Sequence, residues 1–352
     1  MNRFCFRIWG DRKDAPLHFV INYFYFLSKM ATFTPLETAI IKIILYFDVF
    51  DYPLNKPEIH AYLGVSCQES ELENALSSLE NNKIICQKAN FYLLVISLDN
   101  EEKRTLDKVN LRKKRNQKAQ EYLQKAYKIS KKIAKFPFIK MVSLSGSISK
   151  NSIDDSSDID YFIITAKNRL WIARLFLMLY KKIGLLNTKT FFCINYIIDE
   201  SVLALSNQSF YVGMEAITII PTAGYGIYEQ FLEENNWIKT FFPNFQKKEK
   251  RKVTDNSISN ISFDFPTQSW LKNFFESLLN GAFGDFIEEK LMQRRHQKWK
   301  KRYPEKWNTE KGIDINKTTF KGHLTDHYGS IMAKFEDKIK IFQQKNPTQK
   351  LF

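Results

Sequence analysis

Two aspartates separated by one residue are the strongest candidates for chemistry in this chain. Asp158 and Asp160 open the run DIDYFIIT, whose apolar character is typical of a β-strand. Residues i and i+2 of a strand point to the same face, so we expect the two carboxylates to lie side by side. Adjacent negative charges repel each other unless one is protonated or a cation joins them. The pair therefore predicts a site for a hard divalent ion with oxygen ligands, Mg²⁺ or Mn²⁺.

A Gly-Ser pair stands upstream of the aspartates. Gly146 and Ser147 follow an apolar run that is expected to be a strand over 139–145. A Gly-Ser turn lets backbone N–H groups and a hydroxyl approach phosphate oxygens closely. Together, the turn and the carboxylates indicate a metal-bound triphosphate. An incoming hydroxyl would then attack the α-phosphorus.

The segment LSGSISKNSIDDSSDIDYFII, residues 144–164, resembles the signature of the nucleotidyltransferase superfamily. DNA polymerase beta and the minimal nucleotidyltransferases share this arrangement of turn, spacer and Asp-apolar-Asp, and the resemblance covers about 138–200. It implies an α/β (α+β) fold with a small mixed sheet. It also implies transfer of a nucleoside monophosphate from an NTP to a hydroxyl of an acceptor, which is a small molecule, a protein or RNA.

The resemblance also implies a third carboxylate on a neighbouring strand. The expected strand, TFFCINYIID over 190–199, carries Asn195 at its central polar position. Asn195 is a candidate metal ligand through its carbonyl oxygen, but an amide is not a base near neutral pH. Asp199 lies on the same face, about 13 Å further along the strand. Two alternatives stay open: an enzyme that uses another base, and a catalytically weakened nucleotide-binding module that regulates, or acts as an antitoxin, through protein contacts.

Two arginines follow the carboxylate strand, near the start of the helix expected over 168–186. Arg169 and Arg174 are candidate nucleotide-binding residues, because the resemblance implies that this helix flanks the nucleotide. The alternative is that they are ordinary solvated charges of a helix.

The amino-acid composition indicates which binding partners and which cellular compartment to expect. A formal net charge of +15 favours an anionic partner, although a generally lysine-rich composition explains it equally well. The four cysteines are scattered and form no CxxC pair, which favours a reducing, cytoplasmic location. No apolar run reaches the length of a membrane-spanning helix, so no membrane partner is expected.

The remaining chain divides into further regions. Residues 30–97 are typical of a winged helix, with three helices followed by two short strands. The helix expected at 68–82 carries four glutamates and no Lys or Arg, so sequence-specific DNA binding is not expected there.

Beyond this unit, 98–137 is predicted as a basic linker helix, 138–235 as the catalytic domain and 236–352 as a mainly helical region. The arginines of the basic helix, Arg104, Arg112 and Arg115, would suit phosphate contacts or a solvated surface. Residues 1–29 are expected to be an extension or a misassigned start.

Overall fold

The computed structural model describes residues 33–95, 101–185, 190–247, 266–306, 314–322 and 327–346. Within these ranges, the side chains of Glu101, Asn195, Lys306, His327 and Tyr328 are not described. The expected extension 1–29 lies outside the described residues. Among the described helices, none is both long and apolar enough to cross a membrane.

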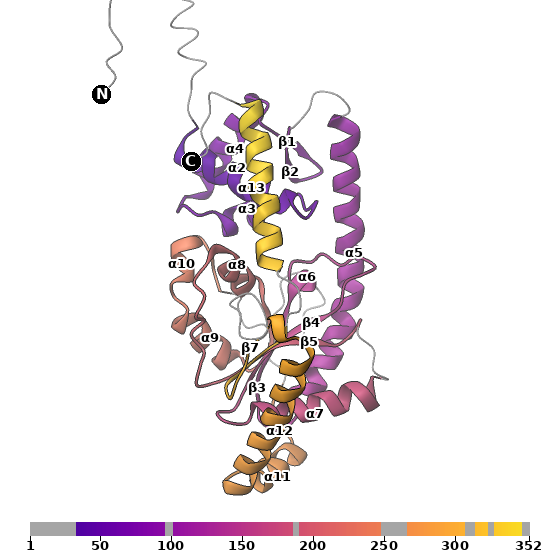
Figure 1. Ribbon diagram of the computed structural model, residues 1–352. Coiled ribbons are helices and arrows are strands. Elements are labelled where there is room, and N and C mark those ends of the chain that lie inside the picture. Colours follow the sequence, from indigo (N-terminus) through magenta and orange to yellow (C-terminus); the bar gives the residue numbers. More distant parts are fainter. Residues whose placement is uncertain are drawn as a thin grey trace, which may run out of the picture.

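The N-terminal unit contains the three helices and the hairpin that the sequence predicts. Its elements, at the top of Figure 1, are α2 (Pro35–Asp48), α3 (Lys56–Tyr62), α4 (Glu69–Asn81), β1 (Ile85–Lys88) and β2 (Phe91–Leu94). Helix α2 begins with a capping box, in which Thr34 and Glu37 each accept a hydrogen bond from the other's backbone N–H. The hairpin turns at Ala89 and Asn90, both with positive φ, which matches the twist of the two strands.

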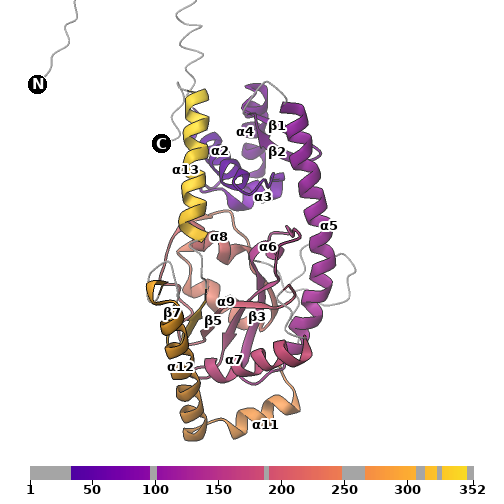
Figure 2. The same cartoon turned by 45° about the vertical axis from the view of Figure 1, so that its right-hand side comes forward.

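A single long helix connects this unit to the rest of the chain. Helix α5 (Glu101–Ile133) has 33 residues, and at a rise of about 1.5 Å per residue it is about 50 Å long. It runs beside both the N-terminal unit and the sheet below it (Figures 1 and 2). The helix predicted for this region is therefore present as one continuous element.

The sheet has six strands in the order β6-β3-β4-β5-β8-β7. The strands are β3 (Ile139–Ser145), β4 (Asp160–Thr165), β5 (Cys193–Asp199), β6 (Ile220–Ala223), β7 (Asp314–Ile315) and β8 (Thr319–Lys321). Strands β4 and β5 are parallel and the other neighbours are antiparallel, so the sheet is mixed, as the predicted α/β (α+β) class requires. Strands β3 and β4 are apolar and almost wholly buried, which places them at the centre of the core.

Helices cover the sheet and extend from it. They are α7 (Leu170–Leu179), which continues as a π-helical turn (Tyr180–Gly184), α8 (Phe210–Thr218), α9 (Tyr225–Glu234), α10 (Ile238–Phe241), α11 (Trp270–Leu278), α12 (Ala282–Arg302) and α13 (His327–Lys345). Helix α13 returns to the N-terminal unit, where Lys338 forms an ion pair with Asp48 of α2.

The region after residue 235 contains more than helices. Its described part is mainly helical, as expected, and β7 and β8 add two short strands to the edge of the central sheet. The hairpin between them is held by Asn316, whose side chain accepts hydrogen bonds from the backbone N–H groups of Thr318 and Thr319. Such short strands give too little apolar alternation to be predicted, because pairing with β5 stabilises them.

A buried glutamate joins α12 to α7. The carboxylate of Glu288 accepts hydrogen bonds from the N–H groups of Trp171 (2.7 Å) and Ile172 (2.8 Å), in the first turn of α7. These donors have no partner within their own helix, so Glu288 acts as a cap supplied by another element. Burial nevertheless raises the pKa of Glu288 to about 7.

This pKa predicts a pH dependence of stability. The folded carboxyl holds its proton up to about pH 7 and the unfolded one only to its ordinary value of 4.5. The folded state binds more protons between these values, so the free energy of unfolding should fall as the pH rises through this window, by up to about 3 kcal/mol. We expect Glu288→Gln to flatten this slope in urea unfolding measured at several pH values. Glu289→Gln, on the exposed neighbour, should leave it unchanged; equal slopes in wild type and Glu288→Gln would contradict the assignment.

Candidate active site

The Gly-Ser turn and the aspartate pair meet at one end of the central strands. Ser145, the last residue of β3, is paired with Asp160, the first residue of β4. Gly146 follows with φ of +66° and begins the short helix α6 (Gly146–Ser149). A methyl group on Gly146 would lie 2.5 Å from Oδ2 of Asp160. The backbone conformation therefore favours glycine, and a side chain here would displace the carboxylate of Asp160.

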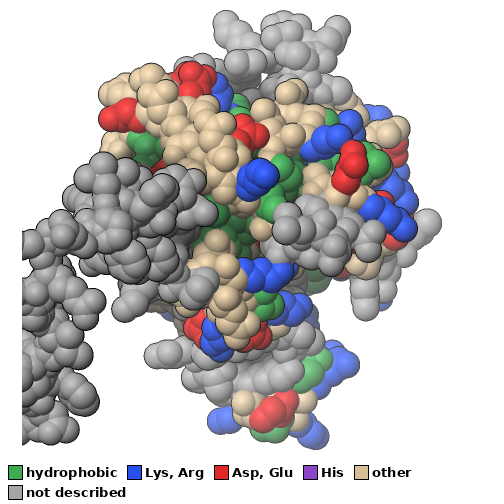
Figure 3. Space-filling view, turned by 90° about the horizontal axis from the view of Figure 1, so that it is seen from above, with side chains coloured by type: hydrophobic (Ala, Val, Ile, Leu, Met, Phe, Trp, Pro, Cys, Tyr) green, Lys and Arg blue, Asp and Glu red, His purple; other side chains and the backbone are tan. Residues whose placement is uncertain are grey.

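A cavity of about 1550 Å³ lies against this end of the sheet. Gly146, Ser147 and Asp160 line it on one side, and aromatic side chains of α2 and the turn after it line another part. Residues of β5, β8, α8, α12 and α13 complete its walls. Seen from above, hydrophobic side chains gather in the recessed middle of the described surface (Figure 3). Pockets for one small ligand usually measure roughly 300–1,000 Å³, so this cavity has room for two substrates.

Asp160 is held in an unfavourable environment for a charge. Burial, together with the negative charges of Asp158 and Glu215, raises the pKa of Asp160 to about 6, although Lys150 and a hydrogen bond with Cys193 act in the opposite direction. Asp158 is partly buried, and it is not among the residues that line the cavity. The structure thus brings Asp158, Asp160, Gly146 and Ser147 together, with Asp160 as the carboxylate that faces the cavity.

Two charged residues of the site were not predicted from the sequence. Lys150 and Glu215 both line the cavity, and their side chains form an ion pair of 2.8 Å. Lys150 follows the Gly-Ser turn by one helical turn, and Glu215 is the one charged residue of α8, FYVGMEAIT. A lone carboxylate within an apolar helix was the available signal for Glu215, because such a residue is rarely buried without a partner.

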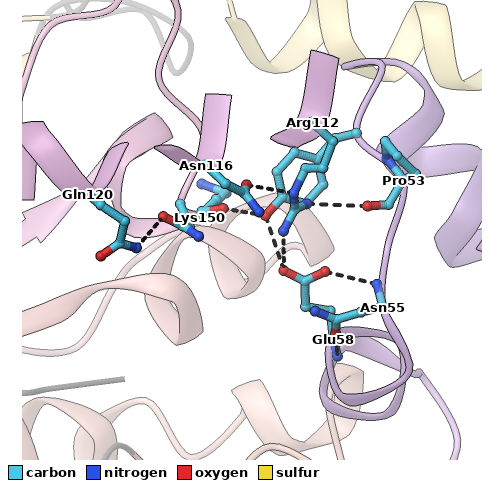
Figure 4. A network of polar contacts seen from close by, with 9 residues as sticks. Pro53, Asn55, Glu58, Arg112, Asn116, Gln120 and Lys150 are labelled. Carbon is cyan, nitrogen blue, oxygen red and sulfur yellow. Dashed lines mark hydrogen bonds and ion pairs between the residues drawn. The ribbon is translucent and has the colours of Figure 1, made fainter. Parts of the chain in front are cut away.

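The turn after α6 is fixed by a polar network from the N-terminal unit (Figure 4). The hydroxyl of Tyr52 donates to the backbone carbonyl of Lys150 and also contacts Glu58. Arg112 of α5 binds Glu58 at 2.6 Å and stacks on the Tyr52 ring at 3.4 Å. Further along α5, Gln120 donates to Asn151 at 2.9 Å.

Arg112 fits neither of the two roles considered for it, a phosphate contact or a solvated surface charge. Its side chain is only 2 % exposed and also donates to Asn116 and to the carbonyl of Pro53. The guanidinium is thus engaged in protein contacts rather than exposed for phosphate. Its role is to tie α5 and the N-terminal unit to the segment that follows the Gly-Ser turn.

Strand β5 was expected to carry the third residue of the metal site, and the structure shows the side chain of Asp199 but not that of Asn195. Asp199 pairs with Thr165 at the opposite end of β4 from Asp160, and it is completely buried. Its carboxylate accepts hydrogen bonds from the N–H groups of Asn168 and Ser201. Asp199 therefore stabilises the turns beyond the strands and is too far from the site to act as a third carboxylate. Asn195 lies within β5, but its side chain is outside the described part of the structure.

The two candidate arginines do not reach the cavity. Arg169 and Arg174 lie at and beyond the start of α7, past the end of β4 that is distant from Asp160. Arg169 is buried and forms an ion pair of 2.6 Å with Asp285 of α12. Arg174 is also buried, with its guanidinium 4.1 Å from the Phe320 ring centroid. Both join α7 to the C-terminal region, so the nucleotide-binding role predicted for them does not fit this geometry.

The oxygen donors at the site suit a hard divalent ion. The oxygen-bearing groups near Asp160 are a second carboxylate, Asp158, and the hydroxyl of Ser147, and their net charge is negative. Such a donor set fits Mg²⁺ or Mn²⁺. Among the described residues no group of three or more His, Cys, Asp or Glu side chains is placed to hold a metal ion. An ion here would thus complete its coordination from a bound ligand and water.

Comparisons with protein-family models, with curated proteins and with solved structures give no match to this chain. The proposals below therefore rest on the residues of this chain itself.

Proposed function

We propose that this protein is a metal-dependent nucleotidyltransferase that moves a nucleoside monophosphate from an NTP to a hydroxyl of an acceptor. One observation carries the proposal: Gly146, in a conformation that favours glycine, lies directly against Asp160 at the wall of a cavity with room for two substrates. In this proposal the six-stranded sheet is the core of a nucleotidyltransferase fold. The three helices and hairpin before it, with the added bridge between Leu54 and Tyr92, form a winged-helix-like unit.

Five residues at the Gly-Ser turn and the aspartate pair have roles in this reaction. Asp158 and Asp160 hold the Mg²⁺ or Mn²⁺ ion, which offsets the negative charge of the phosphates when bound. The backbone at Gly146 and the hydroxyl of Ser147 bind the outer phosphates, and the ammonium group of Lys150 adds positive charge beside them. The acceptor oxygen forms a bond to the α-phosphorus while the bond to pyrophosphate breaks.

Glu215 supplies the base in this proposal. The acceptor hydroxyl must lose its proton as it attacks, and Asn195 does not take it near neutral pH. Glu215 lines the cavity and is close enough to Asp160 to raise its pKa. Its ion pair with Lys150, at 2.8 Å, fixes the position of the carboxylate in the cavity wall.

The test is label transfer. The protein would be incubated with each α-labelled NTP, with Mg²⁺ or Mn²⁺, and with cell extract as the source of acceptor. Transfer by the wild type and its loss in Asp158→Ala/Asp160→Ala is the expected result. Glu121→Ala/Asp337→Ala is the matched control, because these exposed carboxylates lie on α5 and α13 and do not line the cavity.

A regulatory module that binds nucleotide and acts through protein contacts is the second candidate. The hydrogen bond from Tyr52 to the carbonyl of Lys150 favours it, because a partner on the N-terminal unit would act directly on the turn that binds phosphate. Nucleotide binding by the wild type without transfer to any acceptor, under every metal condition, would overturn the enzyme and support this module.

A further inference from the structure

Helix α11 presents its apolar side away from the protein. Trp270, Leu271, Phe274 and Leu278 all fall within about 100° of one another around the helix axis, at 3.6 residues per turn. Each of them is about half exposed or more, and Trp270 is 75 % exposed. Surface helices of globular proteins normally bury the side that carries such residues. An exposed apolar side of this kind marks an interaction surface.

The polar side of α11 holds the helix against the sheet. Lys272 is buried, and its ammonium group donates to the carbonyl of Ile139 at 2.6 Å. Glu276 accepts a hydrogen bond from the N–H of Phe138 at 2.6 Å. Both partners belong to the start of β3 and the residue before it. The orientation of α11 is thus fixed by specific hydrogen bonds, and its apolar side is turned outward by them.

Neighbouring elements extend the apolar surface. Phe283 and Phe286, at the start of α12, are 59 % and 60 % exposed. Helix α7 lies next to α11, with the rings of Phe176 and Phe275 5.2 Å apart, and α11 and the adjoining end of α12 form the lower end of the molecule (Figure 2). Ile183, in the π-helical turn after α7, is 73 % exposed. We call the residues Trp270, Leu271, Phe274, Leu278, Phe283 and Phe286 the α11 face.

Lysines surround the contact between these elements. The last turn of α5 and the residues after it carry Lys131, Lys132 and Lys135, all exposed, and the hydroxyl of Ser269 before α11 donates to the carbonyl of Lys135. The π-helical turn adds Lys181 and Lys182 and contacts the same region through Tyr180 and Phe136. Two nearby carboxylates already have partners. Glu276 accepts a hydrogen bond from the N–H of Phe138, and Asp285 forms an ion pair with Arg169.

We propose that the α11 face docks on the surface of an anionic lipid bilayer. Trp, Phe and Leu side chains on one side of a short helix enter the headgroup region, and nearby lysines attract anionic lipids. The lysines beside the α11 face favour an anionic bilayer over a second copy of this chain. In a symmetric contact between two copies, the same lysines would face each other and repel. No spanning helix is needed, so this inference replaces the expectation that no membrane is involved. It does not depend on the proposed function.

The test is sedimentation of the full-length protein with vesicles of phosphatidylcholine and phosphatidylserine mixed at about 7:3, beside vesicles of phosphatidylcholine alone. We expect binding to the anionic vesicles that is at least tenfold stronger than to the neutral ones. Trp270→Ser/Phe274→Ser should reduce it tenfold or more. Leu106→Ser/Ile341→Ser, which removes two exposed apolar side chains far along α5 and α13, is the matched control and should bind as the wild type does.

A second variant keeps the result decisive if the first one misfolds. Lys131→Gln/Lys132→Gln/Lys135→Gln changes exposed side chains only and should weaken binding to anionic vesicles severalfold. The proposal would be overturned by wild-type protein that binds neither kind of vesicle, or by Trp270→Ser/Phe274→Ser and the triple lysine variant binding as the wild type does. A third result would also overturn it: a wild-type dimer, seen by light scattering, that binds no vesicles and that Trp270→Ser/Phe274→Ser converts to a monomer. The α11 face would then be occupied by a second copy of the chain.

Discussion

Gly146→Ala is expected to lower nucleotide transfer by about 100-fold or more, which is the loss that a misplacement of about 1 Å at a reacting centre causes. The alanine methyl would lie 2.5 Å from Oδ2 of Asp160, so either the turn or the carboxylate must move. The positive φ of this residue adds backbone strain of about 1–2 kcal/mol. Transfer assays and NTP binding, measured on the same preparation, would both report the loss.

Gly226→Ala is the matched control for this variant. Gly226 lies in α9, and a methyl group there meets no atom within 4 Å. It should transfer label as the wild type does, with unchanged or slightly higher stability. Full activity in Gly146→Ala would show that the contact between the turn and Asp160 has no part in the reaction.

Arg112→Ala is expected to have the largest effect on stability, about 3 kcal/mol, because it removes one partner of a buried ion pair. The change removes the cationic partner of Glu58, which keeps hydrogen bonds only from Tyr52 and the N–H of Asn55. It also removes a donor from the carbonyl of Pro53 and the guanidinium from the Tyr52 ring. Tyr52 also holds the carbonyl of Lys150, so the loss should extend to the Gly-Ser turn. A lower melting temperature and weaker NTP binding in the surviving folded protein are the two readouts.

Lys113→Ala changes the exposed neighbour of Arg112 on the same helix and should leave both readouts unchanged. Arg112→Lys tests the shape of the group, because an ammonium cannot bind Glu58, Asn116 and Pro53 together as a guanidinium does. It should recover only part of the stability. An Arg112→Ala protein as stable as the wild type would show that the N-terminal unit is held in place without this pair.

Local patterns were sufficient to predict much of the fold. The apolar runs predicted strands at 139–145 and 158–165, and the observed strands are Ile139–Ser145 and Asp160–Thr165. The helix caps, the proline positions and the hairpin turn gave the elements of the N-terminal unit for the same reason: each signal acts within a few residues. Gly146 comes directly after β3 and Asp160 is the first residue of β4. Because β3 and β4 form an antiparallel pair, Gly146 lies beside Asp160.

Contacts between distant segments were not predictable in this way. Arg169 and Arg174 were candidates for nucleotide binding, with solvated helix charges as the alternative, but they contact α12 and β8, which are more than a hundred residues further along the chain. Glu215 reaches the site because α8 packs over the end of the sheet, and Arg112 is buried because α5 passes the N-terminal unit. A sequence shows the type of each charge but not which remote partner will neutralise it.

The return of α13 to α2 has a consequence for how the protein is made. Asp48 binds Lys108 of α5 and Lys338 of α13, and Ile331 of α13 lines the cavity. Of the described elements, α13 is the last to be synthesised, and it packs against the first. A nascent chain therefore holds an incomplete cavity for most of translation, and its substrates meet a closed site only after α13 has left the ribosome. Ribosome-bound chains that stop before residue 327 should accordingly fail to retain NTP, even though the Gly-Ser turn and both aspartates are already in place.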